Sequence, residues 1–208
     1  LSFKLTGAQE RVINECLTDM MSPRPMNRLI QGDVGSGKTA VAAALMYISA
    51  GNGFQSALMA PTELLAEQHF KTLCKITENS GIKCALLTGS LTKKQKDEVK
   101  AGLKSGEIKV AVGTHALLTD DVEFENLGLV VTDEQHRFGV GQRGRLSSKG
   151  NNPHTLVMSA TPIPRTLGLI IYGDLDISII DEYPAGRQKI ATYCVDSSYN
   201  ARVYNYIK

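Results

Sequence analysis

Residues 28–48, RLIQGDVGSGKTAVAAALMYI, decide the fold of this chain. Gly32 to Thr39 fits the pattern G-x-x-x-x-G-K-[ST], and it stands directly after an expected strand and directly before an expected helix. A loop that wraps a phosphate group turns backbone N–H groups inward and takes dihedral angles that glycine tolerates best. The pattern predicts a phosphate-binding P-loop, and the alternative is a glycine-rich turn with a purely structural role.

Each type of residue in this loop has its own expected role. Lys38 supplies a point charge to the β- and γ-phosphates, and the hydroxyl of Thr39 is a ligand for Mg²⁺. The helix that follows directs its positive end at the same phosphates. The sequence therefore predicts that a nucleoside triphosphate binds here. The expected contacts are Gly32, Gly35, Ser36, Gly37, Lys38 and Thr39.

Short apolar runs alternate with amphipathic stretches along the chain. The runs are continuous rather than alternating, which indicates strands buried on both faces of a parallel sheet. We therefore expect an α/β fold of the P-loop NTPase class, with three layers around a central, mostly parallel sheet. Besides the first strand at 28–32, the expected strands are 55–61, 83–89, 108–114, 127–134 and 154–162. The expected helices are 6–21, 62–78 and 92–104, and the last of them opens with a capping box, Thr92 to Gln95.

The second informative stretch is VVTDEQHRFGV, residues 130–140. Asp133 and Glu134 end an apolar run, and such a pair taken alone is more often a solvated strand end. The P-loop upstream favours a catalytic interpretation. A carboxylate beside the loop can hold the Mg²⁺ that bridges the phosphates, and a second can orient and deprotonate the attacking water. We expect Asp133 to bind the metal, Glu134 to be the base, and Lys38 to complete the catalytic group.

A further strand end, MSATPIPRTL, carries small hydroxyl side chains. Ser159 and Thr161 can bond to the region of His136 and respond to the γ-phosphate. The alternative is a plain strand end at which Thr161 caps the next helix.

Composition excludes several classes of protein. Lys and Arg number 23 against 21 Asp and Glu, so the net charge of +2 gives no overall sign of nucleic-acid binding. The four cysteines have no zinc spacing and are expected to be reduced, as in a cytoplasmic protein. No apolar run approaches the roughly 20 residues of a membrane span. We also expect the chain to be part of a longer protein.

Seven motifs follow one another: GDVGSGKT, APTELLAEQH, TGS, GTHALL, DEQHRFGV, SATPIPRTL and YGDLDISIIDEYPAGR. Together they resemble the first RecA-like motor domain of the RecG family of superfamily 2 DNA helicases, over residues 1 to about 190. Residues 191–208 are expected to begin a linker or a second RecA-like domain, with a strand at 189–196. The family usually has Pro-Pro-Gly-Arg where this chain has Pro-Ala-Gly-Arg at 184–187, so no role is assigned to Arg187.

The resemblance implies that ATP with Mg²⁺ drives movement along branched double-stranded DNA. It also implies a second RecA-like domain and a wedge domain in the same full-length chain, a monomeric state, and little activity in this part alone. Gln9 is then expected to pair with adenine, although Thr6 to Gln9 also fits a helix capping box. The expected DNA contacts, which could equally be ordinary turns, are Pro61, Thr62, Thr88, Gly89, Ser90, Gly113, Thr114 and His115.

Two other functions stay open at this point. One is a translocase similar to the transcription-repair coupling factor Mfd, recruited by a stalled polymerase. The other is a P-loop switch that binds partners without doing work. The segment LTKKQ lacks the aspartate with which GTPase switches bind guanine. Arg137, Arg143 and Arg145 form either a solvated basic face or a contact with DNA or a neighbouring domain.

Overall fold

A seven-stranded sheet is the centre of the structure, a computed structural model that describes residues 4–78, 80–133, 140–161, 175–184 and 194–207. The strand order is β3-β4-β2-β5-β6-β1-β7, and every pair of neighbours is parallel. The expected α/β fold is confirmed, with a sheet that is wholly parallel in the described residues. The strands are β1 (Asn27–Gly32), β2 (Gln55–Met59), β3 (Cys84–Leu87), β4 (Val110–Gly113), β5 (Leu127–Asp133), β6 (His154–Ser159) and β7 (Asp176–Ile180).

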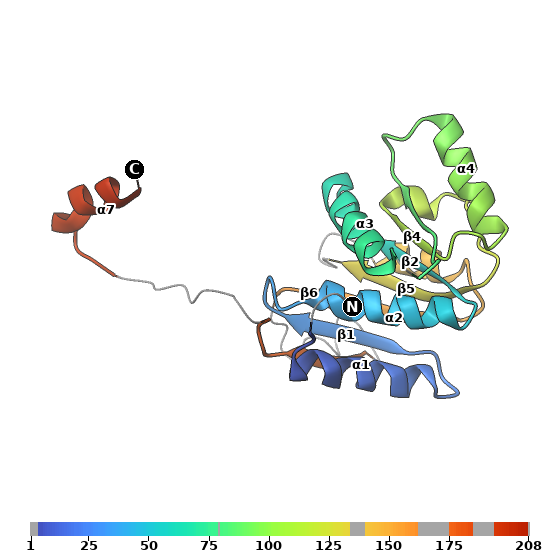
Figure 1. Ribbon diagram of the computed structural model, residues 1–208, viewed down its shortest axis with the longest axis horizontal. Helices are drawn as coiled ribbons and strands as arrows, with labels where there is room; N and C mark the ends of the chain where they lie inside the picture. The colour runs from blue at the N-terminus through green and yellow to red at the C-terminus, as the bar shows by residue number, and fades with distance from the viewer. Residues whose placement is uncertain (1–3, 79, 134–139, 162–174, 185–193, 208) are drawn as a thin grey trace.

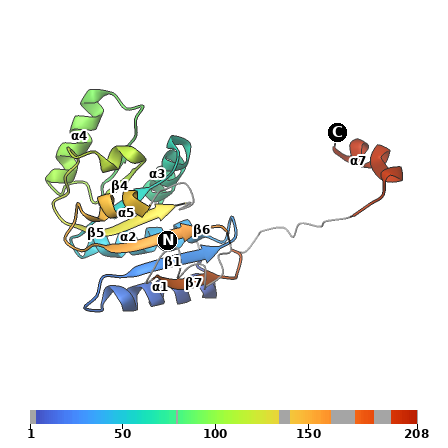
Figure 2. The same cartoon turned by 180° about the vertical axis from the view of Figure 1, so that it is seen from behind.

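Helices cover both faces of this sheet, as Figures 1 and 2 show from opposite sides. Three helices pack on one face: α1 (Gly7–Met20), α2 (Lys38–Gly51) and α3 (Glu63–Thr77). The other face carries α4 (Lys93–Lys104), the short 3-10 helix η1 (His115–Leu118) and α5 (Val140–Ser147). In β5, Leu129 and Val131 belong to the first core and Val130 to the second. Two buried faces explain why the strands are continuous apolar runs.

Two of the helices begin with the capping boxes that the sequence predicts. In α1, Thr6 Oγ1 accepts from the backbone N–H of Gln9, and the Gln9 side chain accepts from the N–H of Thr6. In α4, Thr92 and Gln95 make the same exchange. Each box satisfies N–H groups at a helix start that have no partner within the helix.

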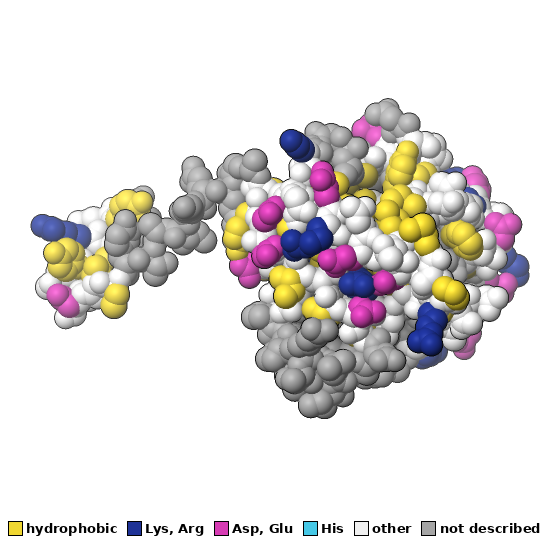
Figure 3. Space-filling model, turned by 90° about the horizontal axis from the view of Figure 1, so that it is seen from below, with side chains coloured by type: hydrophobic (Ala, Val, Ile, Leu, Met, Phe, Trp, Pro, Cys, Tyr) yellow, Lys and Arg dark blue, Asp and Glu magenta, His cyan; other side chains and the backbone are white. Residues whose placement is uncertain are grey.

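The strand β7 was not predicted as a separate element. Among the described strands it pairs only with β1, at the edge of the sheet, and its side chains alternate between buried and exposed positions. Such a strand lacks the continuous apolar run that reveals the central strands. Beside it, the side of the molecule that carries α1 mixes acidic and basic side chains (Figure 3). Arg11 of α1 bonds there to Asp181 at 3.1 Å.

Part of the predicted strand at 189–196 lies outside the described residues. Residues 194–196 have no regular secondary structure, and they are followed by a 3-10 helix η3 (Ser197–Tyr199) and by α7 (Asn200–Ile207). Figure 1 draws α7 apart from the sheet. A domain boundary near residue 190 stays a prediction. In the part of the chain that is described, no helix has the length and apolar character of a membrane span.

The carboxyl ends of all seven strands lie along one edge of the sheet, because the strands are parallel. Along this edge β6 alone separates β1 from β5. Gln31 stands beside Ser159, and Asp133 stands beside Met158. Neighbouring strands are about 4.8 Å apart, so the P-loop strand and the strand that ends in Asp133 are roughly 10 Å apart. One edge therefore carries both predicted parts of the nucleotide site.

Candidate functional site

The loop between β1 and α2 has a backbone that requires glycine. Gly35 and Gly37 have φ angles of 82° and 88°, in the left-handed region. A Cβ at Gly37 would also lie 2.2 Å from Nε2 of Gln9, and one at Gly32 would lie 2.9 Å from the backbone oxygen of Ile180. The loop therefore approaches α1 at Gly37 and β7 at Gly32 so closely that neither position has room for a Cβ atom.

The start of α2 suits an anion. Gly37 is the N-cap and makes no side-chain capping bond, and the first turn holds no acidic residue. The first N–H groups of a helix have no partner within it, and they carry the positive end of the helix dipole. A 14-residue helix that begins with Lys38 directly after a glycine loop is therefore a fitting site for phosphate groups.

Lys38 lies folded back over its own loop. Its Nζ donates to the backbone oxygens of Gly32 at 2.6 Å and Asp33 at 2.9 Å. These bonds hold the ammonium group at the loop, where the sequence predicts the phosphates. Among the described residues, Ser36 Oγ is a buried side-chain oxygen for which no hydrogen-bond partner is found. A bound phosphate would give both groups acceptors in the same place.

Gln9 is 2% exposed and joins α1 to the P-loop. Its Nε2 donates to the backbone oxygen of Ser36 at 2.8 Å, while its Oε1 accepts from Thr6 N at 3.0 Å. The capping-box interpretation is confirmed by this geometry. Pairing with adenine stays a prediction, and the amide is already engaged with the loop that would hold the phosphates.

Asp133 is the last residue of β5 and is 9% exposed. Its Oδ2 lies 2.7 Å from Nε2 of His69, a buried residue of α3. The sequence reasoning missed His69, although a histidine on the helix face that also carries Ala66 and Leu73 is a signal that could have found it. Glu134 and His136 lie outside the described residues, so their predicted roles stay predictions.

The hydroxyl residues after β6 form a compact turn. Ser159 Oγ lies 3.0 Å from Thr161 Oγ1 and accepts from Thr161 N at 3.2 Å. Gln31 of β1 donates to the backbone oxygen of Thr161 at 3.3 Å. This turn links the end of β6 to the strand that leads into the P-loop, which is where a response to the γ-phosphate was expected.

The predicted DNA contacts stand at the carboxyl ends of β2, β3 and β4, on the same edge. Thr62 caps α3, and its Oγ1 accepts from Leu65 N at 3.3 Å. Ser90 N donates to Glu63 Oε1 at 3.1 Å, and hydrogen bonds from Ser90 hold the pKa of that carboxyl below its usual value. The remaining members lie at the same strand ends: Pro61, Thr88, Gly89 and Thr114 follow the strands, Gly113 is the last residue of β4, and His115 is the first residue of η1.

The basic segment is only partly described. Arg137 lies outside the described residues, and nothing is described of the side chain of Arg143. Arg145 is largely exposed and lies 3.6 Å from Asp120. An exposed pair of this kind contributes little to stability, and it leaves both interpretations of the segment open.

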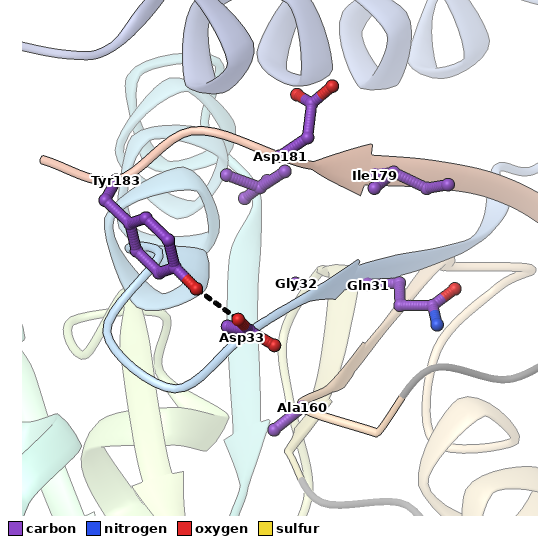
Figure 4. Close-up of a pocket in the computed structure, with 8 residues that line it drawn as sticks. Gln31, Gly32, Asp33, Ala160, Ile179, Asp181 and Tyr183 are labelled. Carbon is purple, nitrogen blue, oxygen red and sulfur yellow. Dashed lines mark hydrogen bonds between the residues drawn. The ribbon is translucent and has the colours of Figure 1, made fainter. Parts of the chain in front are cut away.

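A cavity of about 300 Å³ adjoins the start of the P-loop on the β7 side (Figure 4). Its wall includes Gly32, Asp33, Ala160 and Tyr183, and the Tyr183 hydroxyl donates to the Asp33 carboxylate. Neither predicted metal ligand lines it. The segment that follows β7 is thus fastened to the P-loop beside this cavity.

The residues present fit Mg²⁺ better than a metal held by protein alone. No cluster of three or more His, Cys, Asp or Glu side chains that could hold a metal occurs in the described part of the chain. Mg²⁺ is usually held by one or two protein oxygens together with water and phosphate oxygens. The hydroxyl of Thr39 and the carboxylate of Asp133 are oxygen donors of this kind.

Comparison with known proteins decides the family. The model of the family described as DEAD/DEAH box helicase matches residues 6–170. The chain belongs to the DEAD/DEAH box helicase family. Among solved structures, this helicase domain is similar to RecG in "Structure of RecG bound to three-way DNA junction", with a TM-score of 0.86 and 48% identity over 100% of the chain and 28% of that structure's chain. The bacteriophage T4 helicase UvsW shares the fold, with a TM-score of 0.64 at 17% identity over 85% of the chain and 60% of that protein.

Curated relatives agree with the resemblance to RecG. The helicase domain is 53% identical over 208 residues to the ATP-dependent DNA helicase RecG of Bacillus subtilis. The aligned region covers 100% of the chain and 30% of that protein. It is 56% identical over 210 residues to RecG of Aquifex aeolicus, of which it covers 26%. The predicted resemblance and RecA-like fold are confirmed, and the chain spans less than a third of these relatives.

Proposed function

We propose that this chain is the ATP-binding half of the motor of an ATP-dependent DNA helicase that remodels branched DNA. The observation that supports this most is the convergence of the P-loop and Asp133 on one edge of the sheet, with a single strand between them. Identity of 53% to a RecG over the whole chain supports the same activity. The coupling of that activity to forks and recombination junctions is part of the proposal.

ATP binding would use groups that are already assembled. The backbone of the glycine loop and the start of α2 would surround the phosphates, and Lys38 would exchange its two carbonyl acceptors for phosphate oxygens. Thr39 and Asp133 would hold Mg²⁺, which neutralises the charge on the β- and γ-phosphates when bound. Gln9 would hold the loop in place through its bond to the backbone oxygen of Ser36.

Hydrolysis needs two further groups. Glu134 is the proposed base, because it follows the proposed metal ligand directly in the chain. An arginine from a second RecA-like domain of the full-length chain would stabilise the charge of the transferring phosphoryl group, which is worth about 10³- to 10⁵-fold in rate. We therefore expect the separate domain to turn over ATP far more slowly than the full-length protein.

DNA would follow the β2, β3 and β4 end of the same edge. The residues there offer hydroxyl and backbone N–H groups, which bind phosphates without distinguishing bases. Such binding agrees with a net charge of only +2. A wedge domain of the full-length chain would contact the branch point. We propose a monomer that acts in the cytoplasm, with Ser159, Thr161 and His136 coupling the nucleotide to the DNA track.

Two substitutions in the full-length protein test this function. Lys38→Ala should abolish nucleotide binding, whereas Glu134→Gln should keep binding and lose DNA-stimulated turnover. Lys83→Ala is the control, since Lys83 is an exposed lysine paired with Glu107. Unchanged nucleotide affinity in Lys38→Ala would reject the proposed site. Nucleotide binding without turnover in the wild-type protein would favour a switch, and binding to RNA polymerase without preference for forks would favour an Mfd-like translocase.

A further inference from the structure

One polar partner of Asp133 comes from α3, a helix that supplies no other residue of the proposed nucleotide site. His69 of α3 is 7% exposed, and its Nε2 lies 2.7 Å from Asp133 Oδ2. The side chains of the pair are 9% and 13% exposed, so solvent reaches the bond little. A buried imidazole therefore contacts the residue that is proposed to bind the metal, and the function of this contact needs an explanation.

The strand order brings these two residues together. The strand β2 pairs with β5, with Met59 beside Thr132. The helix α3 begins soon after β2, at the cap residue Thr62. Its first two turns therefore rise beside the carboxyl end of β5, and the residue three positions after Ala66 lies on the same buried face. After α3 the chain forms β3 and β4 and then β5, which pairs with β2. This order places His69 of α3 next to Asp133 of β5.

The bond from His69 restrains rotation of the Asp133 carboxylate. The terminal torsion of a carboxylate is broad, and an ionised carboxylate has about four acceptor positions on its two oxygens. Beside an ionised carboxylate the imidazole Nε2 is the donor, and its bond of 2.7 Å to Oδ2 uses one of these positions and limits the rotation of the group. Mg²⁺ requires nearly ideal octahedral geometry, so the orientation of a ligand oxygen affects its affinity.

We propose that His69 is a positioning residue that orients the Asp133 carboxylate for the Mg²⁺ bound with the nucleotide. The inference rests on the proposed function, because it requires that Asp133 serve the metal. Groups that hold a metal-binding carboxylate in place commonly affect metal affinity by about 10- to 100-fold. His69 would act on the metal only through Asp133 and need not contact ATP.

The test measures metal binding rather than turnover. In the full-length protein with a non-hydrolysable ATP analogue, Mn²⁺ replaces Mg²⁺, and free Mn²⁺ is followed by electron paramagnetic resonance. His69→Leu removes the donor, while His69→Gln retains an N–H at a similar reach. Thr77→Val is the matched control, because Thr77 is buried on the same face of α3 and its hydroxyl bonds to Leu73 O at 2.9 Å.

We expect His69→Leu to weaken Mn²⁺ binding about 10- to 100-fold and His69→Gln and Thr77→Val to stay close to wild type. Nucleotide affinity without metal should be the same in all four proteins. Wild-type Mn²⁺ affinity in His69→Leu would overturn the inference, as would equal losses in the Leu and Gln variants. If the Leu variant does not fold, His69→Met fills the space with a flexible chain and takes its place. Absence of Mn²⁺ binding in the wild-type complex would instead reject the proposed metal site.

Discussion

The substitution Gly37→Ala should loosen the P-loop more than its backbone angle alone explains. A residue with a Cβ in the left-handed region costs about 1–2 kcal/mol. Gly53→Ala carries that same cost, because Gly53 has a φ of 86° and no atom within 4 Å of its added Cβ. Only at Gly37 does the new Cβ lie 2.2 Å from Gln9 Nε2, which must then leave Ser36 O. Losing this buried bond adds about 1–3 kcal/mol.

Hydrogen exchange in the full-length protein, followed by mass spectrometry, measures this difference locally. Relative to wild type, the peptide over 29–41 in Gly37→Ala should exchange faster than the peptide over 48–56 in Gly53→Ala, by a further factor of roughly 5 to 150. Nucleotide affinity should fall in Gly37→Ala and stay unchanged in Gly53→Ala. Equal local effects of the two substitutions would refute the claim that Gln9 supports the loop.

Three further predictions concern other parts of the domain. Burial lowers the pKa of His154, whose Nδ1 accepts from Met26 N at 2.9 Å. The unfolded chain therefore binds a proton more readily than the folded protein, and stability should fall as the pH drops below about 6.5. Thermal unfolding across this range should depend less on pH in His154→Gln. Burial raises the pKa of the Cys16 thiol to about 12, whereas Cys194 is exposed, so maleimide at about pH 8 should label Cys194 and spare Cys16 until the protein unfolds, as peptide mass spectrometry would show. A Cβ at Gly113 would lie 2.2 Å from a backbone oxygen of β3, so Gly113→Ala should cost about 1–3 kcal/mol and accelerate exchange in β3 and β4, and wild-type exchange there would contradict the packing argument.

The central strands and the P-loop could be predicted because their signals are local. An apolar run, a glycine turn and a helix start lie within 28–48, and every central strand is buried on both faces. The capping boxes of α1 and α4 are likewise local patterns of four residues. The edge strand β7 was missed because one exposed side replaces its apolar run with an alternating pattern.

The contacts that unite the candidate site could not be predicted from local patterns. The bond from His69 to Asp133 joins residues 64 positions apart, and it depends on β5 lying beside β2. The bond from Gln9 to Ser36 spans 27 positions. Strand order is set by how whole helices pack across the sheet, and neither residue type nor spacing in this single sequence specifies it.

The strand β5 lies in the middle of the sheet, between the strands next to the P-loop and the strands next to the proposed DNA contacts. Three strands lie on each side of it, with the phosphate loop among β6, β1 and β7 and the proposed nucleic-acid track among β2, β4 and β3. Asp133, the last residue of β5, therefore lies between these two groups of strands, and it is bonded to His69 of α3, the helix that follows β2. If Asp133 binds Mg²⁺ as proposed, a displacement of α3 would be transmitted to the metal through the His69 imidazole, without deformation of the sheet.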